Sequence, residues 1–331
     1  MTDTAEFYRE AQHLRLSNIG LGTYLGAMDD ATDQGYIEAV ITAVRLGLNV
    51  IDTSLNYRNQ RSERAVGEAL RRLFANGEAR RDEMVVCTKA GFLVPNAVPA
   101  SLKPEDIVDD MHSMAPLFLT DQLERSRRNL GLDMIDVFYL HNPETQLHRI
   151  ARDQFYARIQ RAFTFLEEAV AQGKIRFYGT ATWDGYRRPP GAPEGLSLED
   201  LNTEAEAAGG TQHHFRFIQL PFNLAMPEAY VERRAGESVV TMAARLGITV
   251  VASASLLQAR LSRNLPEELA ARLLPGAATD AQRAIQFTRS TPGITTALVG
   301  MSKPEHVREN LGLAVVPPLS EPDYRALYRQ G

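Results

Sequence analysis

The stretch AVRLGLNVIDTSLNY (residues 43–57) contains the unit from which the rest of this 331-residue chain is built. It joins the end of an amphipathic segment to a glycine, a short apolar run and a group of polar residues. Glycine commonly follows the last turn of a helix, and short apolar runs are typical of strands covered on both faces. The stretch therefore predicts a helix that leads directly into a buried strand. The same junction recurs in RRNLGLDMID (127–136), EEAVAQGKIRF (167–177) and AARLGITVVA (243–252).

Eight such apolar runs alternate with amphipathic stretches along the chain. Eight strand–helix units in about 300 residues are typical of a (β/α)8 barrel, which needs about 250. We see no linker, and therefore expect one α/β domain over residues 1–331, a TIM barrel. The predicted strands are 18–24, 49–54, 84–90, 134–141, 175–182, 217–223, 249–255 and 295–301. The predicted helices are 34–47, 61–75, 120–131, 152–172, 197–208, 236–246, 279–290 and 304–312.

The connections between these elements differ in length. Those that lead from a helix to a strand are short, whereas four that follow strands are long and rich in proline, glycine or small polar residues. In a barrel the latter all rise from the C-terminal end, where such proteins place their active sites. We therefore expect a roofed pocket there. The long connections are 91–119, 183–196, 224–235 and 256–278, and the candidate apolar walls are Phe92, Leu93, Met111, Met114 and Trp183.

Composition and charge narrow the classes of function. The net charge is −5 without any basic block, which argues against nucleic acid as a partner. No run approaches the roughly 18 apolar residues of a membrane helix, and the polar N-terminus lacks the features of an export signal. The single cysteine, Cys87, lies in an apolar run and fits a small core residue in a reducing compartment. We expect a cytoplasmic protein without a membrane or nucleic-acid partner.

Four ionisable residues lie at or just past the ends of successive predicted strands: Asp52, Tyr57, Lys89 and His141. Neighbouring strand ends converge in a barrel, so these side chains are expected to share one pocket. A phenol has a pKa of about 10; a buried lysine beside it lowers that value, and an aspartate keeps the lysine charged. A histidine can orient a carbonyl oxygen towards the phenol. The set predicts delivery of a proton to an oxygen that is becoming an alkoxide.

Each of these residues also has an ordinary structural interpretation. Taken alone, Asp52 fits a turn cap, and Lys89 fits a lysine whose stem packs along an apolar edge. His141 fits a hydrogen-bonded core histidine, and Tyr57 fits a half-buried aromatic residue. Their joint position across the strand ends favours one shared site over four unrelated roles.

The sequence around these residues resembles the aldo-keto reductases, NAD(P)(H)-dependent (β/α)8 barrels, over nearly the full length of the chain. The most specific match is DTSLNYRNQRSERAVGEAL (52–70), which is similar to the family's D-T-x-x-x-Y followed by S-E-x-x-x-G-x-A-L. The resemblance gives Tyr57 the role of the acid and makes Asp52, Lys89 and His141 the other members of a tetrad. Further matching segments are GLGTY (20–24), GKIRFYG (173–179), IQLPFN (218–223) and PEHVREN (304–310).

The resemblance implies reversible reduction of an aldehyde or ketone, with hydride from nicotinamide C4 and a proton from Tyr57. It also implies a cofactor extended across the barrel mouth, without a glycine-rich Rossmann loop. NADP(H) is expected, with NAD(H) as the alternative, together with a small-molecule carbonyl substrate and a monomeric chain. The implied cofactor-binding residues are Gly22, Thr23, Tyr24, Asp52, Thr182, Gln219, Ser253, Gly300, Ser302, Lys303, His306, Glu309 and Asn310.

Several of these positions depart from the family pattern. Ala181 and Thr182 stand where the family commonly has Ser-Asn for the carboxamide. Ser253 stands where a tyrosine commonly stacks on the nicotinamide, and Phe222 or Trp183 are candidates to replace that tyrosine. At the adenosine end, Gly300–Met301 replaces a Lys-Ser pair of one branch, and His306 replaces its arginine.

Two other classes of function stay open at this stage. The potassium-channel β-subunit branch of the superfamily suggests a nicotinamide-binding regulatory subunit with little turnover. A barrel hydrolase would need a metal cluster or paired carboxylates at the strand ends, and the sequence places neither there. His213 and His214 are adjacent in a polar loop, and two neighbours seldom bind a metal without further ligands. We therefore expect no metal.

Overall fold

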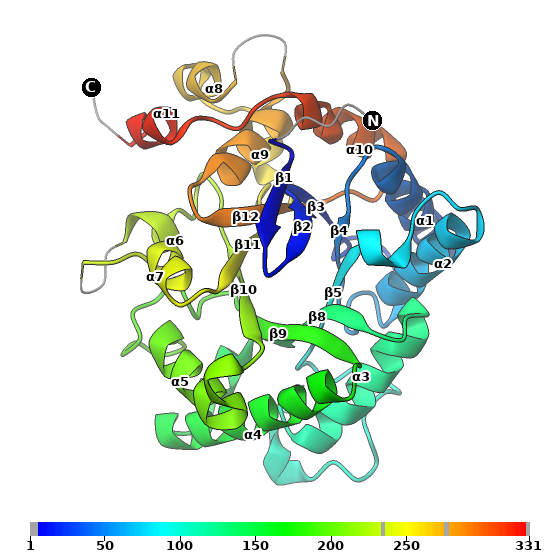
Figure 1. Ribbon diagram of the computed structural model, residues 1–331, viewed down its shortest axis with the longest axis vertical. Coiled ribbons are helices and arrows are strands. Elements are labelled where there is room, and N and C mark those ends of the chain that lie inside the picture. Colours follow the sequence, from blue (N-terminus) through cyan, green and yellow to red (C-terminus); the bar gives the residue numbers. More distant parts are fainter. Residues whose placement is uncertain (1–5, 233–235, 275–277, 329–331) are drawn as a thin grey trace.

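The computed structural model describes residues 6–232, 236–274 and 278–328. Over these residues eight parallel strands form a closed barrel surrounded by helices (Figure 1), which confirms the predicted (β/α)8 fold. Each predicted strand overlaps an observed one. In their order around the ring, the strands are β3 (Ile19–Gly22), β4 (Val50–Asp52), β5 (Val85–Ala90), β8 (Ile135–His141), β9 (Ile175–Ala181), β10 (Phe215–Pro221), β11 (Thr249–Ser253) and β12 (Ile294–Gly300).

Each predicted helix is also present. The glycine junctions behave as expected: Gly131 and Gly173 have φ values of 66° and 69°, a left-handed conformation that glycine adopts without steric cost. The predicted helices are α1 (Asp30–Arg45), α2 (Arg61–Ala75), α3 (Pro116–Leu130), α4 (Arg152–Ala171), α5 (Leu198–Gly209), α7 (Val239–Arg245), α9 (Asp280–Ser290) and α10 (Pro304–Leu311). The additional ones within the described part of the chain are α6 (Glu228–Val231), α8 (Glu267–Leu273), α11 (Glu321–Ala326) and six 3-10 turns, η1 (Arg81–Glu83), η2 (Pro104–Asp106), η3 (Pro143–His148), η4 (Gly210–Gln212), η5 (Arg260–Ser262) and η6 (Gly312–Val315).

An antiparallel hairpin that the sequence did not predict precedes the barrel. Its strands are β1 (Tyr8–Ala11) and β2 (Leu14–Ser17), and it lies over one end of the barrel in Figure 1. Leu14 and Leu16 are buried in the same apolar cluster as Val50 and Val85, near the starts of β4 and β5. The hairpin therefore closes the N-terminal end of the barrel.

The strands alternate between two apolar environments. Along β8, Val137 and Tyr139 belong to the cluster inside the barrel, whereas Phe138 and Leu140 belong to the larger cluster shared with the helices. Side chains two residues apart share a face of a strand. His141 therefore has the same parity as Val137, and it faces inward at the C-terminal end of β8.

The barrel closes along a seam between its first and last strands. Ile19 of β3 is in register with Ala297 of β12. Close to this seam the side chain of Arg289 is fully buried, and it donates hydrogen bonds to Asn18 Oδ1 (3.3 Å) and to the Val316 carbonyl (2.6 Å). Residues 271 positions apart in the chain are thus joined directly.

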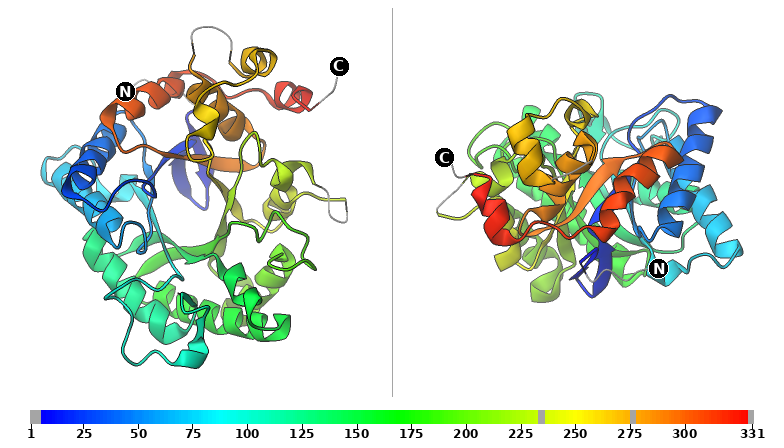
Figure 2. Two further views of the ribbon diagram at one scale, coloured as in Figure 1. Left: turned by 180° about the vertical axis from the view of Figure 1, so that it is seen from behind. Right: turned by 90° about the horizontal axis from the view of Figure 1, so that it is seen from above.

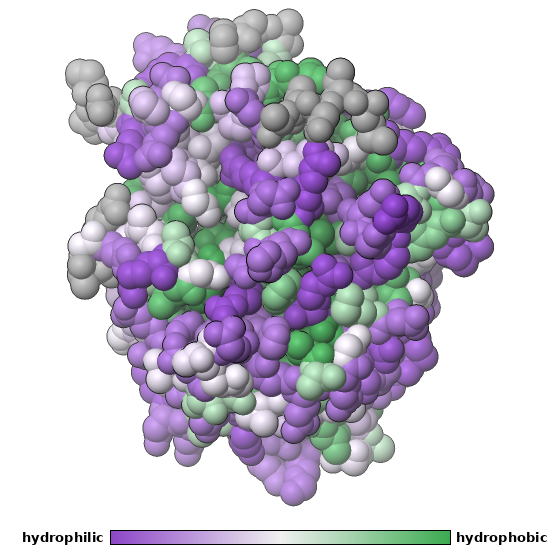
Figure 3. All heavy atoms as spheres, in the orientation of Figure 1, coloured by the Kyte–Doolittle hydropathy of each residue, from purple (hydrophilic) through white to green (hydrophobic). Residues whose placement is uncertain are grey.

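The long connections that follow the strands gather at the opposite end from the hairpin (Figure 2, left). The longest of them contains a small antiparallel hairpin, β6 (Ile107–Val108) and β7 (His112–Ser113). Polar side chains cover most of the face seen in Figure 3. None of the described helices is both long enough and apolar enough to cross a membrane.

Candidate active site

The alternation of side chains between the two faces of each strand determines where the predicted ionisable residues point. Val50 on β4 and both Val85 and Cys87 on β5 face the barrel interior. Asp52 and Lys89 lie two residues further along these strands, so their side chains face the interior at its C-terminal end. Both residues are buried, with 4% and 1% of their surface exposed.

Lys89 is the centre of the polar network at this end. Its ammonium group lies 2.5 Å from Asp52 Oδ2 and 3.3 Å from the Tyr57 hydroxyl, and it also donates to the Thr53 carbonyl. Burial lowers the pKa of Lys89, but Asp52 and Tyr57 together raise it by more than burial lowers it. The net shift is therefore upward. The ammonium group is therefore charged where it faces the phenol.

The pKa of Tyr57 differs in direction from the sequence-based expectation. Burial raises the pKa of this phenol, Lys89 lowers it and Asp52 raises it, and the net shift is upward. The expectation of a lowered value is wrong, because it considered the charge of Lys89 without the cost of placing a phenolate in a poorly hydrated pocket. Tyr57 is accordingly a protonated phenol at neutral pH, with a cation beside its oxygen.

His141 completes the predicted set. Its Nδ1 lies 3.2 Å from the Ser54 hydroxyl, and the rings of Tyr57 and Phe92 meet it edge-on at centroid distances of 5.7 and 5.0 Å. Burial, Lys89 and His112 lower the pKa of His141 well below its ordinary value. The imidazole is therefore neutral, and the structure brings all four predicted residues together.

His112, which the sequence did not single out, supports His141 from the long insert after β5. Its Nε2 lies 2.7 Å from the carbonyl oxygen of His141, and its Nδ1 lies 2.8 Å from the amide nitrogen of Gln146. Arg158 of α4 donates in turn to Gln146 Oε1. Gly91 makes room for this contact, since a Cβ at that position would lie 2.4 Å from the His141 carbonyl oxygen. Gly91, directly after CTKA, was the one feature of the sequence that indicated a close contact here.

A cavity of about 450 Å³ opens beside these residues at the C-terminal end of the barrel. Tyr24 stands at its mouth, 56% exposed, with its ring edge-on to Tyr57 at 5.0 Å. Gln219 lines the cavity and donates to Asp52 Oδ1 (2.8 Å), so its amide is fixed by the ion pair. The predicted cofactor residues that line it are Gly22, Thr23, Tyr24, Asp52, Thr182, Gln219, Ser253 and Gly300.

The remaining predicted cofactor residues lie in and before α10, outside the lining of this cavity. Lys303 and His306 are exposed at the start of the helix. Glu309 accepts a hydrogen bond from the Thr279 hydroxyl (2.8 Å). Asn310 is 4% exposed, and its side-chain oxygen has no partner among the described residues. The five residues outside the lining are Ser302, Lys303, His306, Glu309 and Asn310.

The aromatic candidates differ in where they lie. Trp183 lines the cavity and is 40% exposed. Phe222 is buried and stacks on Phe287 with its ring plane 4° from parallel, away from the cavity lining. The suggestion that Phe222 stacks on the nicotinamide is therefore wrong, because Phe222, directly after the end of β10, packs against Phe287 of α9. Of the predicted apolar walls, Phe92 and Trp183 line the cavity, whereas Leu93, Met111 and Met114 do not.

No cluster of three or more potential metal ligands occurs within residues 6–232, 236–274 and 278–328.

Comparison with known proteins gives related sequences and folds. A protein of Schizosaccharomyces pombe, named as a candidate voltage-gated potassium channel subunit beta, is 24% identical over 90% of this chain and 84% of its own length. The NADH-specific methylglyoxal reductase of Escherichia coli is 30% identical over 176 residues, which are 52% of this chain and 50% of the reductase.

Solved structures share the fold over nearly the whole chain. A Klebsiella pneumoniae aldo/keto reductase, in complex with NADP and acetate, superposes with a TM-score of 0.69 at 22% identity, covering 98% of both chains. The glycerol dehydrogenase of Gluconobacter oxydans superposes with a TM-score of 0.71 at 19% identity, covering 98% and 94%. Residues 18–329 match the sequence profile of the Aldo/keto reductase family. The chain therefore belongs to the aldo/keto reductase family, whose members are NAD(P)-dependent oxidoreductases acting on carbonyl and alcohol groups.

Proposed function

We propose that this protein reduces an aldehyde or ketone to an alcohol with NADP(H), and that Tyr57 is the proton donor. The observation that carries the proposal is the contact of Tyr57 with Lys89 (3.3 Å) at the wall of the cavity, beside His141. Bound nicotinamide supplies a hydride from C4 to the carbonyl carbon. The Tyr57 hydroxyl gives its proton to the carbonyl oxygen, and the product is the alcohol.

The charge left on Tyr57 explains the polar network around it. Loss of the proton produces a buried phenolate, which is stable only beside a cation. Lys89 supplies that cation, and Asp52, at 2.5 Å, balances it while Tyr57 is protonated. Proton uptake from solvent then restores the phenol. Because the pKa of Tyr57 is raised, the acid form required for reduction is the populated one at neutral pH.

His141 orients the substrate through a hydrogen bond to the carbonyl oxygen. A neutral imidazole has one N–H, so its Nε2 can donate into the cavity only in the tautomer whose Nδ1 is unprotonated. The Ser54 hydroxyl lies 3.2 Å from Nδ1 and also has acceptors in Asn56 Oδ1 (2.6 Å) and the Lys89 carbonyl (3.2 Å). The proposed role requires the tautomer with the proton on Nε2.

The residues present fit a dinucleotide in two places. At the cavity, the Gln219 amide and the Thr182 hydroxyl offer polar groups for the nicotinamide end. At α10, the unpartnered, buried oxygen of Asn310 suits an amino group such as that of adenine. Lys303 and His306 are exposed beside it, and the ammonium group of Lys303 together with an imidazole N–H of His306 suits a 2′-phosphate. These features favour NADP(H), with NAD(H) as the alternative.

The proposed substrate is an uncharged carbonyl compound. Among the described residues that line the cavity, none is lysine, arginine or glutamate, and the carboxylate of Asp52 is already engaged by Lys89 and Gln219. Tyr24, Phe92 and Trp183 supply aromatic walls instead. An anionic substrate would find no counter-ion among these groups.

Oxidation of NADPH in the presence of a panel of aldehydes and ketones tests the proposal. The Tyr57→Phe variant removes the acid while preserving the ring, and its kcat is expected to fall by about 10²–10⁴-fold. Fluorescence titration with NADPH and NADH shows that the variant still binds the cofactor. Full turnover by Tyr57→Phe would contradict the role of Tyr57.

A second function, a nicotinamide-binding regulatory subunit with little turnover, is favoured by the similarity to the S. pombe protein named as a candidate channel subunit. The same titration, combined with the turnover assay, distinguishes the two. Tight cofactor binding combined with negligible multiple turnover on every carbonyl tested would favour the regulatory subunit.

A further inference from the structure

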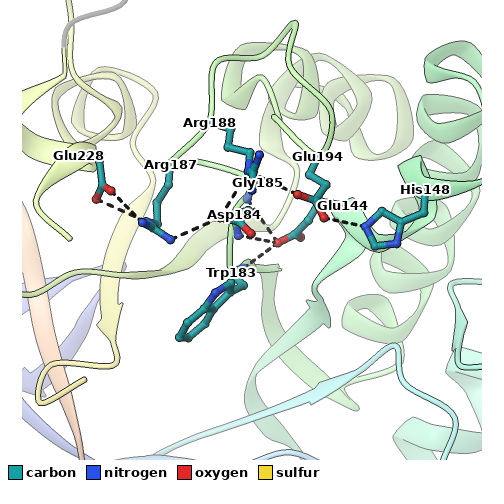
Figure 4. Close-up of polar contacts among 9 residues, drawn as sticks. All are labelled: Glu144, His148, Trp183, Asp184, Gly185, Arg187, Arg188, Glu194 and Glu228. Carbon is teal, nitrogen blue, oxygen red and sulfur yellow. Dashed lines mark hydrogen bonds and ion pairs between the residues drawn. The ribbon is translucent and has the colours of Figure 1, made fainter. Parts of the chain in front are cut away.

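A buried carboxylate lies behind one wall of the proposed active site. Glu144 is on η3, three residues after His141, and it is 3% exposed. Its Oε1 accepts hydrogen bonds from three successive backbone amides, those of Trp183 (2.7 Å), Asp184 (3.1 Å) and Gly185 (3.3 Å) (Figure 4). These amides are the first part of the loop that leaves the C-terminal end of β9.

The contact is an unusual one for a buried charge. Among the described residues, no cationic side chain forms an ion pair with Glu144, and its Oε2 is buried without a hydrogen-bond partner. An ionised carboxylate that is removed from water is costly unless other groups compensate for it. The backbone amides of the loop are the compensating groups here. The loop and the carboxylate therefore depend on each other.

The rest of the loop is held by other residues. Arg187 pairs with Glu228 of α6 (2.8 Å), and Arg152 of α4 donates to the carbonyls of Ala192 and Gly195. These contacts fix the loop from Arg187 onwards. Only the Glu144 contacts, among those described, capture the amides at Trp183 and its two neighbours, where the loop borders the cavity.

We propose that Glu144 is a positioning residue that holds Trp183 in place as a wall of the substrate pocket, through its contacts with the backbone of Trp183–Gly185. The proposal rests on the proposed reductase function only for its effect on substrate binding. A carboxylate is suited to the task because one oxygen can accept several N–H bonds, and a charged acceptor makes each of them stronger.

The strength of this hold depends on the charge of Glu144. Burial raises the pKa of Glu144 to about 7, and the backbone amides oppose that shift. Ionisation as the pH rises through 7 therefore strengthens the hold on the loop. The segments next to Glu144 contain further ionisable groups: His141 on β8, His148 on η3, Asp184, Tyr186, Arg187, Arg188 and Glu194 on the loop, Arg152 on α4 and Asp109 on the insert.

Trp183 is the only tryptophan of the chain, so fluorescence excited at a wavelength that tyrosine does not absorb reports on this wall. In the protein without cofactor, Glu144→Ala is expected to increase quenching of Trp183 by acrylamide and to lower its emission anisotropy. Glu144→Gln keeps the size and one acceptor oxygen but cannot ionise. It is expected to abolish any change of the wild-type emission between pH 6 and 8.

Two control variants separate Glu144 from its surroundings. Glu194 lies on the same loop, but it pairs with His148 and Arg188 rather than with the amides at Trp183. Glu194→Gln should therefore leave the emission unchanged. His148 also has a raised pKa, so His148→Gln shows whether the transition belongs to that residue instead. A transition that persists in Glu144→Gln and disappears in His148→Gln would overturn the proposal.

Kinetics supply the second readout, on a carbonyl compound that the wild-type protein reduces. Glu144→Ala is expected to raise KM about tenfold while kcat changes by less than about threefold, because the proton donor is untouched. Trp183→Phe should raise KM similarly, and the double variant should be no worse than either single one. Additive effects would show that Glu144 does not act through Trp183. If no carbonyl is reduced, the proposed function fails while the fluorescence test still decides the role of Glu144.

Discussion

Asp52 and Glu144 are two carboxylates buried at the same end of the barrel, and their surroundings are opposite in kind. Asp52 lies against the ammonium of Lys89 (2.5 Å) and the amide of Gln219 (2.8 Å). Glu144 meets backbone N–H groups only, and burial raises its pKa to about 7. Asp52 is balanced by a cation, whereas Glu144 has only main-chain donors and titrates near neutral pH.

The two carboxylates therefore act on different parts of the site. Asp52 is part of a charge chain that ends at the Tyr57 hydroxyl, so a change there is expected to affect the reaction itself. Glu144 is connected to a segment of main chain, so a change there is expected to affect shape and pH dependence. Three substitutions test this division.

Removing the cation beside Asp52 should have the largest effect. Lys89→Met keeps most of the length of the side chain but leaves Asp52, and the phenolate formed on Tyr57, without a counter-ion. We expect kcat to fall by about 10³-fold, and the free energy of unfolding to fall by about 3–5 kcal/mol, as when one partner of a buried ion pair is removed. Lys103→Met, at an exposed lysine of the insert, is the control for loss of a positive charge. Activity within tenfold of wild type would remove Lys89 from the proposed proton chemistry.

Removing the charge of Glu144 should change how stability depends on pH. The pKa of Glu144 is about 7 in the folded protein against 4.5 ordinarily, so the unfolded chain ionises first. The wild-type protein is therefore expected to lose up to about 3 kcal/mol of stability from this group as the pH rises from about 4.5 to 7. Glu144→Gln should lack this loss. Urea unfolding at pH 5 and pH 8 measures it, with Glu105→Gln, at an exposed carboxylate of the insert, as the control. Equal pH dependence in Glu144→Gln and wild type would contradict the prediction.

Removing a nearby exposed ion pair should have the smallest effect. His148 lies between Asp109 of the insert (3.2 Å) and Glu194 of the loop (2.6 Å), with 41% of its side chain exposed. Its partners raise its pKa above 6.5, so the stabilisation is fully present below pH 6.5 and is lost as the pH rises through the raised value. His148→Gln should cost less than about 1 kcal/mol at pH 6 and less still at pH 8, since solvent screens such pairs. Thermal unfolding at the two pH values measures the difference. A larger cost at pH 8 than at pH 6 would show that the charge of His148 is not involved.

The sequence predicted the barrel well because its information is local. Each strand is a short apolar run, and glycines such as Gly131 end the preceding helices at the predicted positions. The hairpin over the barrel end was missed because Leu14 and Leu16 alternate with polar residues and do not form an apolar run. Its burial depends on a barrel end that only the assembled fold provides.

The proton-donating set was predictable for a related reason. Asp52, Lys89 and His141 each lie two residues after an inward-facing strand residue, so the alternation of side chains along the strands determines where they meet. Glu144 and His112 were not predictable, because each acts on the main chain of a segment distant in sequence. Main-chain amides and carbonyls have no residue identity, so the sequence records such a contact only indirectly, as at Gly91 beside the His141 carbonyl.

The seam between β3 and β12 has a consequence for how the molecule forms. The strand that begins at Ile19 cannot acquire both of its neighbours until the strand that begins at Ile294 has been synthesised. Contacts between such distant parts of a chain slow folding, because the intervening segment must lose its freedom first. During synthesis the early strands are therefore expected to wait as an open sheet with an exposed edge. Closure of the barrel is then among the last events, and the risk of aggregation is greatest just before it.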